Sequence, residues 1–265
     1  MVDLSQFIAS LLIGIDKGGI PGFGALGMAV VLSSSSSQYT RHILAIFAPV
    51  LMLADVGALY AYRNDIDFLL IVNIGIPIVA GMVLSFIFLG HQNEDIVRKS
   101  TGFSLLLLAA VYFVSRKLRH RLSKAAILPY AHVIDADLNQ SYNVVDLKRN
   151  IFCVVVGVLT GILTVIANVA GPIIAVYLIQ LNLPKRRLNG TRALLFLLVN
   201  FVKIPAQLYL GNMRTGDWSE VVPLAIVAMI STLLTEAFIM PLVDQSRFET
   251  ITWALVSLGA VRLIL

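Results

Sequence analysis

Several charged and amide side chains lie inside long apolar stretches, where an ionisable group is costly and usually functional. Lys17 belongs to the stretch GIDKGGIPGFG and Lys203 to the stretch VNFVKIPAQLYLG. Asn200, Lys203 and Gln207 are spaced i, i+3 and i+7, so they share one face of a helix. A polar face in an apolar segment turns toward protein or water, and two buried lysines favour an anionic ligand.

The stretch around Lys17 also contains residues that break a helix. Gly18, Gly19 and Gly22 permit positive φ and close backbone approach, and Pro21 removes a backbone donor. We expect a new helix to start just after the proline, with its free N–H groups and positive dipole end directed toward the membrane midplane. Kinks that allow close helix packing are the alternative, because glycine is common in membrane helices.

A second break, in the sequence ANVAGP, occurs in the other half of the chain. With a constant offset of 151 residues, Pro172 falls on Pro21 and Asn168 falls on Lys17. We expect Asn168 and the backbone at Gly171 to face the first break, so that two half-helix N-termini meet one anion.

The composition identifies the protein as an integral membrane protein. The chain has 265 residues, of which 58% are hydrophobic and only 13% are charged. Soluble domains carry roughly 25% charged residues. The apolar runs are continuous rather than alternating, which predicts membrane helices and an all-α polytopic fold. We predict eight hydrophobic segments: 4–32, 41–62, 67–90, 100–117, 150–183, 191–211, 218–242 and 247–265.

The polar stretch 118–149 divides the chain into halves of similar size. The offset of 151 residues also aligns the Thr-Arg pair at 40–41 with the pair at 191–192. We therefore predict an N-terminal repeat at 1–117, a basic linker at 118–149 and a C-terminal repeat at 150–265. Internal repeats are common in secondary transporters.

Segments one and five, 4–32 and 150–183, are longer than one crossing and are broken near their middles. If both are re-entrant hairpins, more basic residues lie on the side of the linker 118–149, which agrees with a cytoplasmic linker. Each half then has one hairpin and three crossings, so the second repeat is inverted relative to the first. Long, kinked helices that span the membrane with a tilt are the alternative.

The remaining charged residues in apolar runs have several interpretations. Asp16 could simply neutralise the lysine beside it. Asp55 and Glu236 are isolated carboxylates that could pair with a lysine or carry a proton in coupled transport. Arg41 and Arg192 are either anchors at the membrane surface or parts of an anion route. We consider these five residues as candidates for coupling or gating.

Other chemistry is not indicated. The four histidines lack metal-ligand spacing, and the sequence has no Walker loop and no GxSxG elbow, so we expect no metal, no cofactor and no enzymatic activity. The basic residues lack interleaved aromatic residues, which argues against nucleic acid. The expected partners are a small anion and the lipid bilayer, with a homo-oligomer left open.

Three stretches together resemble the TauE/SafE sulfite exporter family: KGGIPGFGALG, GILTVIANVAGPIIAVYL and NGTRALLFLLVNFVKIPAQLYLG. The resemblance covers both halves apart from the central linker, although the second stretch departs from the glycine-rich form. It implies secondary transport of sulfite or a small organosulfonate, usually outward across the bacterial cytoplasmic membrane. Members of the family also include carriers of other small oxoanions or carboxylates.

We therefore predict a secondary anion exporter that works by alternating access, with sulfite or an organosulfonate such as sulfoacetate as the substrate. An anion channel, and a membrane-embedded enzyme or assembly subunit, are the alternatives. The predicted substrate-binding residues come from both breaks and from the polar helix face: Lys17, Gly18, Gly19, Pro21, Gly22, Asn168, Gly171, Pro172, Asn200, Lys203 and Gln207.

Overall fold

The computed structural model describes most of six of the eight predicted segments. The described residues are 3–20, 22–89, 95–97, 99–100, 102–103, 106, 145–168, 171–180 and 185–240. Pro21, most of the fourth segment, the linker up to residue 144 and the eighth segment lie outside the described residues.

Every regular element in the described part of the chain is helical. The longer helices are α1 (Leu4–Lys17), α2 (Phe23–Ser34), α3 (Thr40–Tyr62), α4 (Phe68–Leu89), α6 (Val145–Ala167), α7 (Gly171–Gln180), α8 (Lys185–Tyr209) and α9 (Trp218–Leu234). Short turns at η1 (Ser37–Tyr39) and η3 (Thr215–Asp217) precede α3 and α9, and the π-helical turn η4 (Thr235–Ile239) follows α9. Four helical stretches among the described residues are long and apolar enough to cross a membrane, so the protein is a multi-pass membrane protein: 40–62, 68–88, 186–209 and 215–239.

The first segment is broken between α1 and α2, and the chain reverses there. Gly22 precedes α2 with φ 110°, a conformation that glycine adopts without strain. A Cβ atom at Gly27 would lie 2.8 Å from Ala9 O, and one at Gly24 would lie 3.3 Å from the Asp16 side chain. Because higher residues of α2 oppose lower residues of α1, the two helices are antiparallel and in close contact.

The fifth segment is broken between α6 and α7. Asn168 has φ 53°, which a short polar side chain tolerates. The helix α7 begins at Gly171, one residue before Pro172 rather than after it, because proline fits the first turn of a helix. The helix α6 begins at Val145, inside the stretch predicted as linker.

The helices α4 and α6 are parallel, because Cys153 Sγ bonds Asn73 O and, further along both helices, Ser85 Oγ bonds Ile162 O. They pack closely through glycines where they cross. A Cβ atom at Gly81 would lie 2.1 Å from Val158 O, and one at Gly161 would lie 2.1 Å from Ile78 O. Only glycine permits this approach of the two backbones. On the other side of the molecule, α1 packs parallel to α9 in the same manner: a Cβ atom at Gly14 would lie 2.4 Å from Ser231 Cβ.

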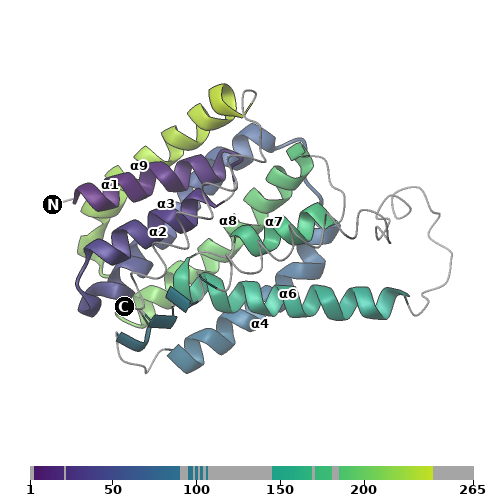
Figure 1. The fold of residues 1–265 in the computed structure, drawn as a ribbon, viewed down its shortest axis with the longest axis horizontal. Helices are drawn as coiled ribbons and strands as arrows, with labels where there is room; N and C mark the ends of the chain where they lie inside the picture. The colour runs from purple at the N-terminus through teal and green to yellow at the C-terminus, as the bar shows by residue number, and fades with distance from the viewer. Residues whose placement is uncertain are drawn as a thin grey trace.

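The helices α3 and α8 pack against each other between these two pairs. The end of α3 at Tyr62 lies against Gly190 near the start of α8. Asp55, earlier in α3, accepts a hydrogen bond from Asn200, later in α8, so the two helices are antiparallel. The helix α3 also packs on α9, and α8 also packs on α4. Figure 1 shows α1, α2 and α9 on one side and α4 and α6 on the other.

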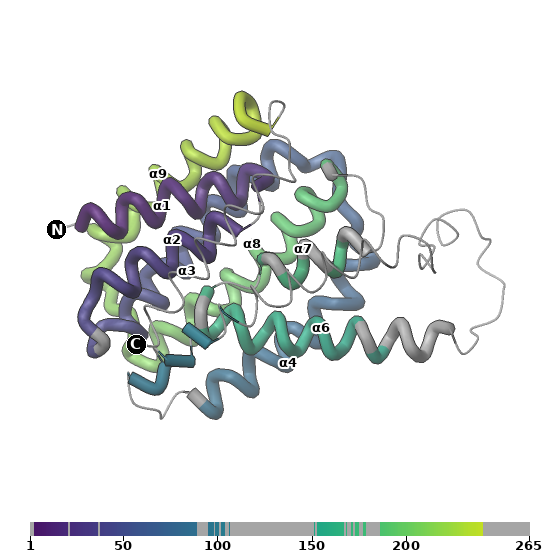
Figure 2. The backbone as a smooth tube through the Cα atoms, in the orientation of Figure 1, coloured from purple at the N-terminus to yellow at the C-terminus, as the bar shows by residue number. Residues whose placement is uncertain are grey.

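The connection after α3 and the start of α8 lie at the same end of the helices. Arg186 Nε lies 3.0 Å from Asp65 Oδ2, and the Asp67 N–H donates to Thr191 Oγ1 at 3.0 Å. The predicted sixth segment began at 191, but α8 starts at Lys185, so the basic run is helical. Figure 2 shows the path of the chain through these connections.

Candidate functional site

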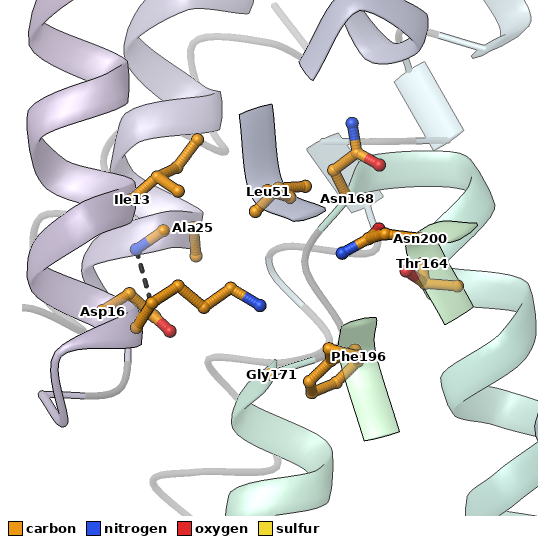
Figure 3. A pocket seen from close by; sticks show the side chains of 11 residues that line it. Ile13, Asp16, Ala25, Leu51, Thr164, Asn168, Gly171, Phe196 and Asn200 are labelled. Atoms are coloured by element: carbon orange, nitrogen blue, oxygen red, sulfur yellow. Dashed lines mark hydrogen bonds between the residues drawn. The ribbon is translucent and has the colours of Figure 1, made fainter. Parts of the chain in front are cut away.

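A small cavity lies where the two breaks approach each other. Its volume is about 20 Å³, which is room for a water molecule. In Figure 3, Ile13, Asp16 and Ala25 lie on one side of it, and Thr164, Asn168, Phe196 and Asn200 lie on the other. The full lining is Ile13, Asp16, Lys17, Gly24, Ala25, Leu51, Thr164, Asn168, Gly171, Phe196 and Asn200.

Lys17 is the cation at this cavity, and its ion pair is with Asp55 on α3. The Lys17 Nζ lies 2.6 Å from Asp55 Oδ1 and 4.7 Å from the centre of the Phe196 ring. Asp55 is completely buried and also accepts a hydrogen bond from Asn200 Nδ2 at 2.9 Å. Because an ionised carboxylate only accepts, this bond orients the Asn200 amide. The Asn200 Oδ1 atom is buried and has no hydrogen-bond partner in the described part of the chain.

Asp16 binds backbone rather than the neighbouring lysine. Its Oδ2 accepts hydrogen bonds from the N–H groups of Gly22 at 2.7 Å and Gly24 at 3.1 Å. The N–H groups at the start of α2, which we expected to face an anion, are therefore occupied by this carboxylate. Arg192 donates to Asp16 O at 2.7 Å, so α8 holds the end of α1.

Lys203 is fully buried and holds the second break. Its Nζ donates to Thr164 O at 3.0 Å and also binds Asn168 Oδ1. Thr164 Oγ1 is a third acceptor at 3.5 Å. Asn168 Nδ2 donates to Leu44 O at 2.7 Å, which ties the second break to α3. Lys203 therefore lies behind Asn168, whereas Lys17 lines the cavity.

The other predicted candidates lie away from this cavity. Gln207 accepts from Asn212 Nδ2 at 2.8 Å and, with Arg41, lines a second cavity of about 30 Å³. Glu236 lies 3.9 Å from Arg186, which is exposed. No three His, Cys, Asp or Glu residues gather into a metal site among the residues that the structure describes.

The glycines of the first break have different surroundings. Gly18 O accepts from Tyr62 Oη at 3.0 Å, and a Cβ atom there would lie 2.5 Å from Thr235 Cβ. Gly19 has φ 129° and lies beside Asn189. These two glycines allow close packing at the break, whereas Gly171 lines the cavity at the start of α7.

Sequence reasoning missed Thr164 and Phe196. Thr164 precedes Asn168 by four residues and Phe196 precedes Asn200 by four, so helical spacing placed each beside a predicted site residue. For the apolar residues that complete the lining, the sequence offered no comparable reason to predict a place at the cavity.

Comparison with protein-family models gives a match over nearly the whole chain. The model described as Sulfite exporter TauE/SafE matches residues 6–263. The chain belongs to the TauE/SafE sulfite exporter family. The predicted resemblance is thereby confirmed, and TauE/SafE is a family of membrane transporters rather than enzymes. Searches of curated proteins and of solved structures found no match.

Proposed function

We propose that this TauE/SafE protein is a secondary transporter that exports a small anion through the site between the two breaks. Sulfite or an organosulfonate such as sulfoacetate is the proposed substrate. One observation carries the proposal: Lys17 and Asn168, which occupy the same position in the two breaks, line one buried cavity. A buried cation and neutral hydrogen-bond donors suit an oxoanion, and the carboxylate in the lining, Asp16, has its Oδ2 bonded to the N–H groups of Gly22 and Gly24.

The proposed binding groups come from both halves of the chain. Lys17 supplies the charge, and the amides of Asn168 and Asn200 supply directional hydrogen bonds after a shift of their present partners. Gly171 lines the cavity at the first position of α7, where the positive end of the helix favours an anion.

We also propose that the two halves, 1–117 and 150–265, are inverted repeats joined by a cytoplasmic linker at 118–149. The pairing of helices supports this arrangement. The first arm of each broken segment packs parallel to the third segment of the other half, as α1 does on α9 and α6 does on α4. The helices α3 and α8, which correspond in the two halves, are antiparallel.

The ends of the helices support re-entrant hairpins, and we propose that the membrane is the bacterial inner membrane. If all eight segments crossed, the loop at 63–67 and the start of α8 would lie on opposite sides. Instead Arg186 Nε donates to Asp65 Oδ2 at 3.0 Å, and Arg187 Nη2 lies 3.3 Å from Asp67 Oδ2. With hairpins, this basic end is cytoplasmic, as the positive-inside rule requires.

Alternating access fits the small size of the cavity. About 20 Å³ holds a water molecule, and a sulfur oxoanion needs more room. In the proposed cycle the two halves therefore separate to admit the anion from one side and then from the other.

Transport by purified protein in lipid vesicles tests this function. We expect saturable flux of radiolabelled sulfite, competed by sulfoacetate, without unitary conductance in bilayer recordings. The variant Lys17→Ala should weaken the apparent affinity by about 100-fold or more, because it removes a buried charged contact. The matched control Arg63→Ala removes an exposed positive charge and should leave the affinity unchanged.

Two results would contradict the proposal. Unitary currents carried by sulfite would show a channel rather than a carrier. Absence of flux for sulfite, sulfonates, other oxoanions and carboxylates would show that the chain does not transport small anions.

A further inference from the structure

Lys17 both forms an ion pair with Asp55 and lines the cavity, so its ammonium group is the countercharge for Asp55 and the candidate contact for an anion. Its Nζ is 2.6 Å from Asp55 Oδ1, and the same residue lines the cavity. Asp55 is fully buried, and its other hydrogen bond comes from a neutral amide, Asn200 Nδ2. An anion that enters the cavity therefore competes with Asp55 for the ammonium group of Lys17.

One ammonium group cannot neutralise two buried negative charges. When Lys17 turns to the anion, Asp55 is left beside Asn200 and a second negative charge. A buried carboxylate without a countercharge is strongly disfavoured in its ionised form, and a nearby like charge disfavours it further. Binding of a proton removes both costs.

We propose that Asp55 takes up one proton each time an anion binds to Lys17, so that anion and proton are carried together. The proton comes from water and forms an O–H bond on the carboxyl group, Lys17 remains an ammonium ion, and release reverses both events. A bound monoanion and proton add no net charge, so the loaded site moves without electrical work. This inference rests on the proposed anion transport.

The other ionisable groups near Asp55 have partners of their own. Lys203 Nζ on α8 donates to Thr164 O and Asn168 Oδ1 and lies 3.5 Å from the Thr164 hydroxyl, so its hydrogen bonds are made at the second break. Arg192 on α8 is always protonated. Asp16 on α1 accepts hydrogen bonds from N–H groups at the start of α2 and lies 3.7 Å from Arg192 Nη1. Of these groups, Asp55 is the one that loses its countercharge when an anion binds Lys17, so it is the group that binds the proton.

Calorimetry of anion binding to the purified full chain tests the inference. The probe is methanesulfonate, because its sulfonate group does not itself bind a proton near neutral pH. Titrations in buffers of different ionisation enthalpy give the number of protons taken up. We expect about one proton per anion and an affinity that falls about tenfold per pH unit in the alkaline range.

The variant Asp55→Asn should bind without proton uptake and with an affinity independent of pH. The control Glu220→Gln, which removes a carboxylate in the first turn of α9, should behave like the wild type. Saturable binding to the wild type without proton uptake overturns the inference and leaves the proposed function standing. Equal uptake by Asp55→Asn also overturns it. Absence of saturable binding of methanesulfonate, sulfite and sulfoacetate overturns the proposed function together with this inference.

Discussion

At the first break the lysine is on the break itself and its carboxylate partner is on α3. At the second break the lysine is on α8 and its amide partner is on the break. Lys17 has one charged partner and lines the cavity, whereas Lys203 is fully buried against three acceptors. A lysine therefore lines the cavity at one break, and at the other it holds the backbone and the amide side chain in place.

The largest expected effect is on stability, from Asp55→Ala. This substitution leaves the Lys17 ammonium buried without its countercharge, which costs about 3–5 kcal/mol. Thermal unfolding in detergent measures it. The double variant Lys17→Met/Asp55→Ala should recover most of the loss, because it removes both charges. A double variant as unstable as Asp55→Ala would show that the ion pair is not what holds the first break.

The second break should respond differently. Lys203→Met leaves Asn168 Oδ1 unpaired, and a buried unpaired acceptor costs about 1–3 kcal/mol. Adding Asn168→Gly removes the unpaired acceptor, and glycine accepts φ 53°, but the substitution also removes the hydrogen bond to Leu44 O, so we expect partial recovery of stability. Melting curves and anion titrations on the same samples separate the two roles of a lysine. If Lys203→Met loses anion binding without losing stability, Lys203 contacts the anion and is not a structural support.

The smallest effect is expected at the exposed end of the bundle. Arg186 is 61% exposed in its ion pair with Asp65, and such pairs contribute about 0–1 kcal/mol. Arg186→Gln should therefore leave both the unfolding midpoint and anion affinity nearly unchanged. A loss of anion affinity comparable to that of Lys17→Ala would show that Arg186 takes part in the path of the anion.

The sequence allowed the main elements to be predicted. The segments 41–62 and 67–90 correspond to α3 and α4, and the break near Lys17 lies between α1 and α2. These predictions succeeded because length, apolarity and helix-breaking residues are local properties. The start of α8 was missed because its basic first turn forms ion pairs with Asp65 and Asp67, in a connection more than 100 residues earlier.

The hydrogen-bond and ion-pair partners of the site residues could not be predicted from their spacing in the sequence. Asp16 and Lys17 are adjacent, but neighbouring residues of a helix point in different directions, so one reaches α2 and the other reaches α3. The shared helix face of Asn200, Lys203 and Gln207 failed to bring them to one cavity. Seven residues of helix rise about 10 Å, so Gln207 lies too far along α8 from Asn200 to reach the same cavity, and it contacts Asn212 instead.

The meeting of Lys17 with Asn168 was the prediction that required the repeat. Neither residue is informative alone, but equal positions in two broken segments suggested a shared site. The structure brings both to one cavity. The carboxylate that binds Lys17 could not be chosen from the sequence, because it depends on how α1 packs beside α3.

A crystal structure of the protein with selenite, the selenium congener of sulfite, shows directly whether the anion binds between the two breaks. Selenium gives an anomalous signal that locates the anion without ambiguity. We predict a peak between the two breaks, within hydrogen-bonding distance of Lys17 Nζ, with the Lys17–Asp55 contact lengthened beyond 2.6 Å. A peak in the cavity lined by Arg41 and Gln207, with the Lys17–Asp55 pair intact, would contradict the account.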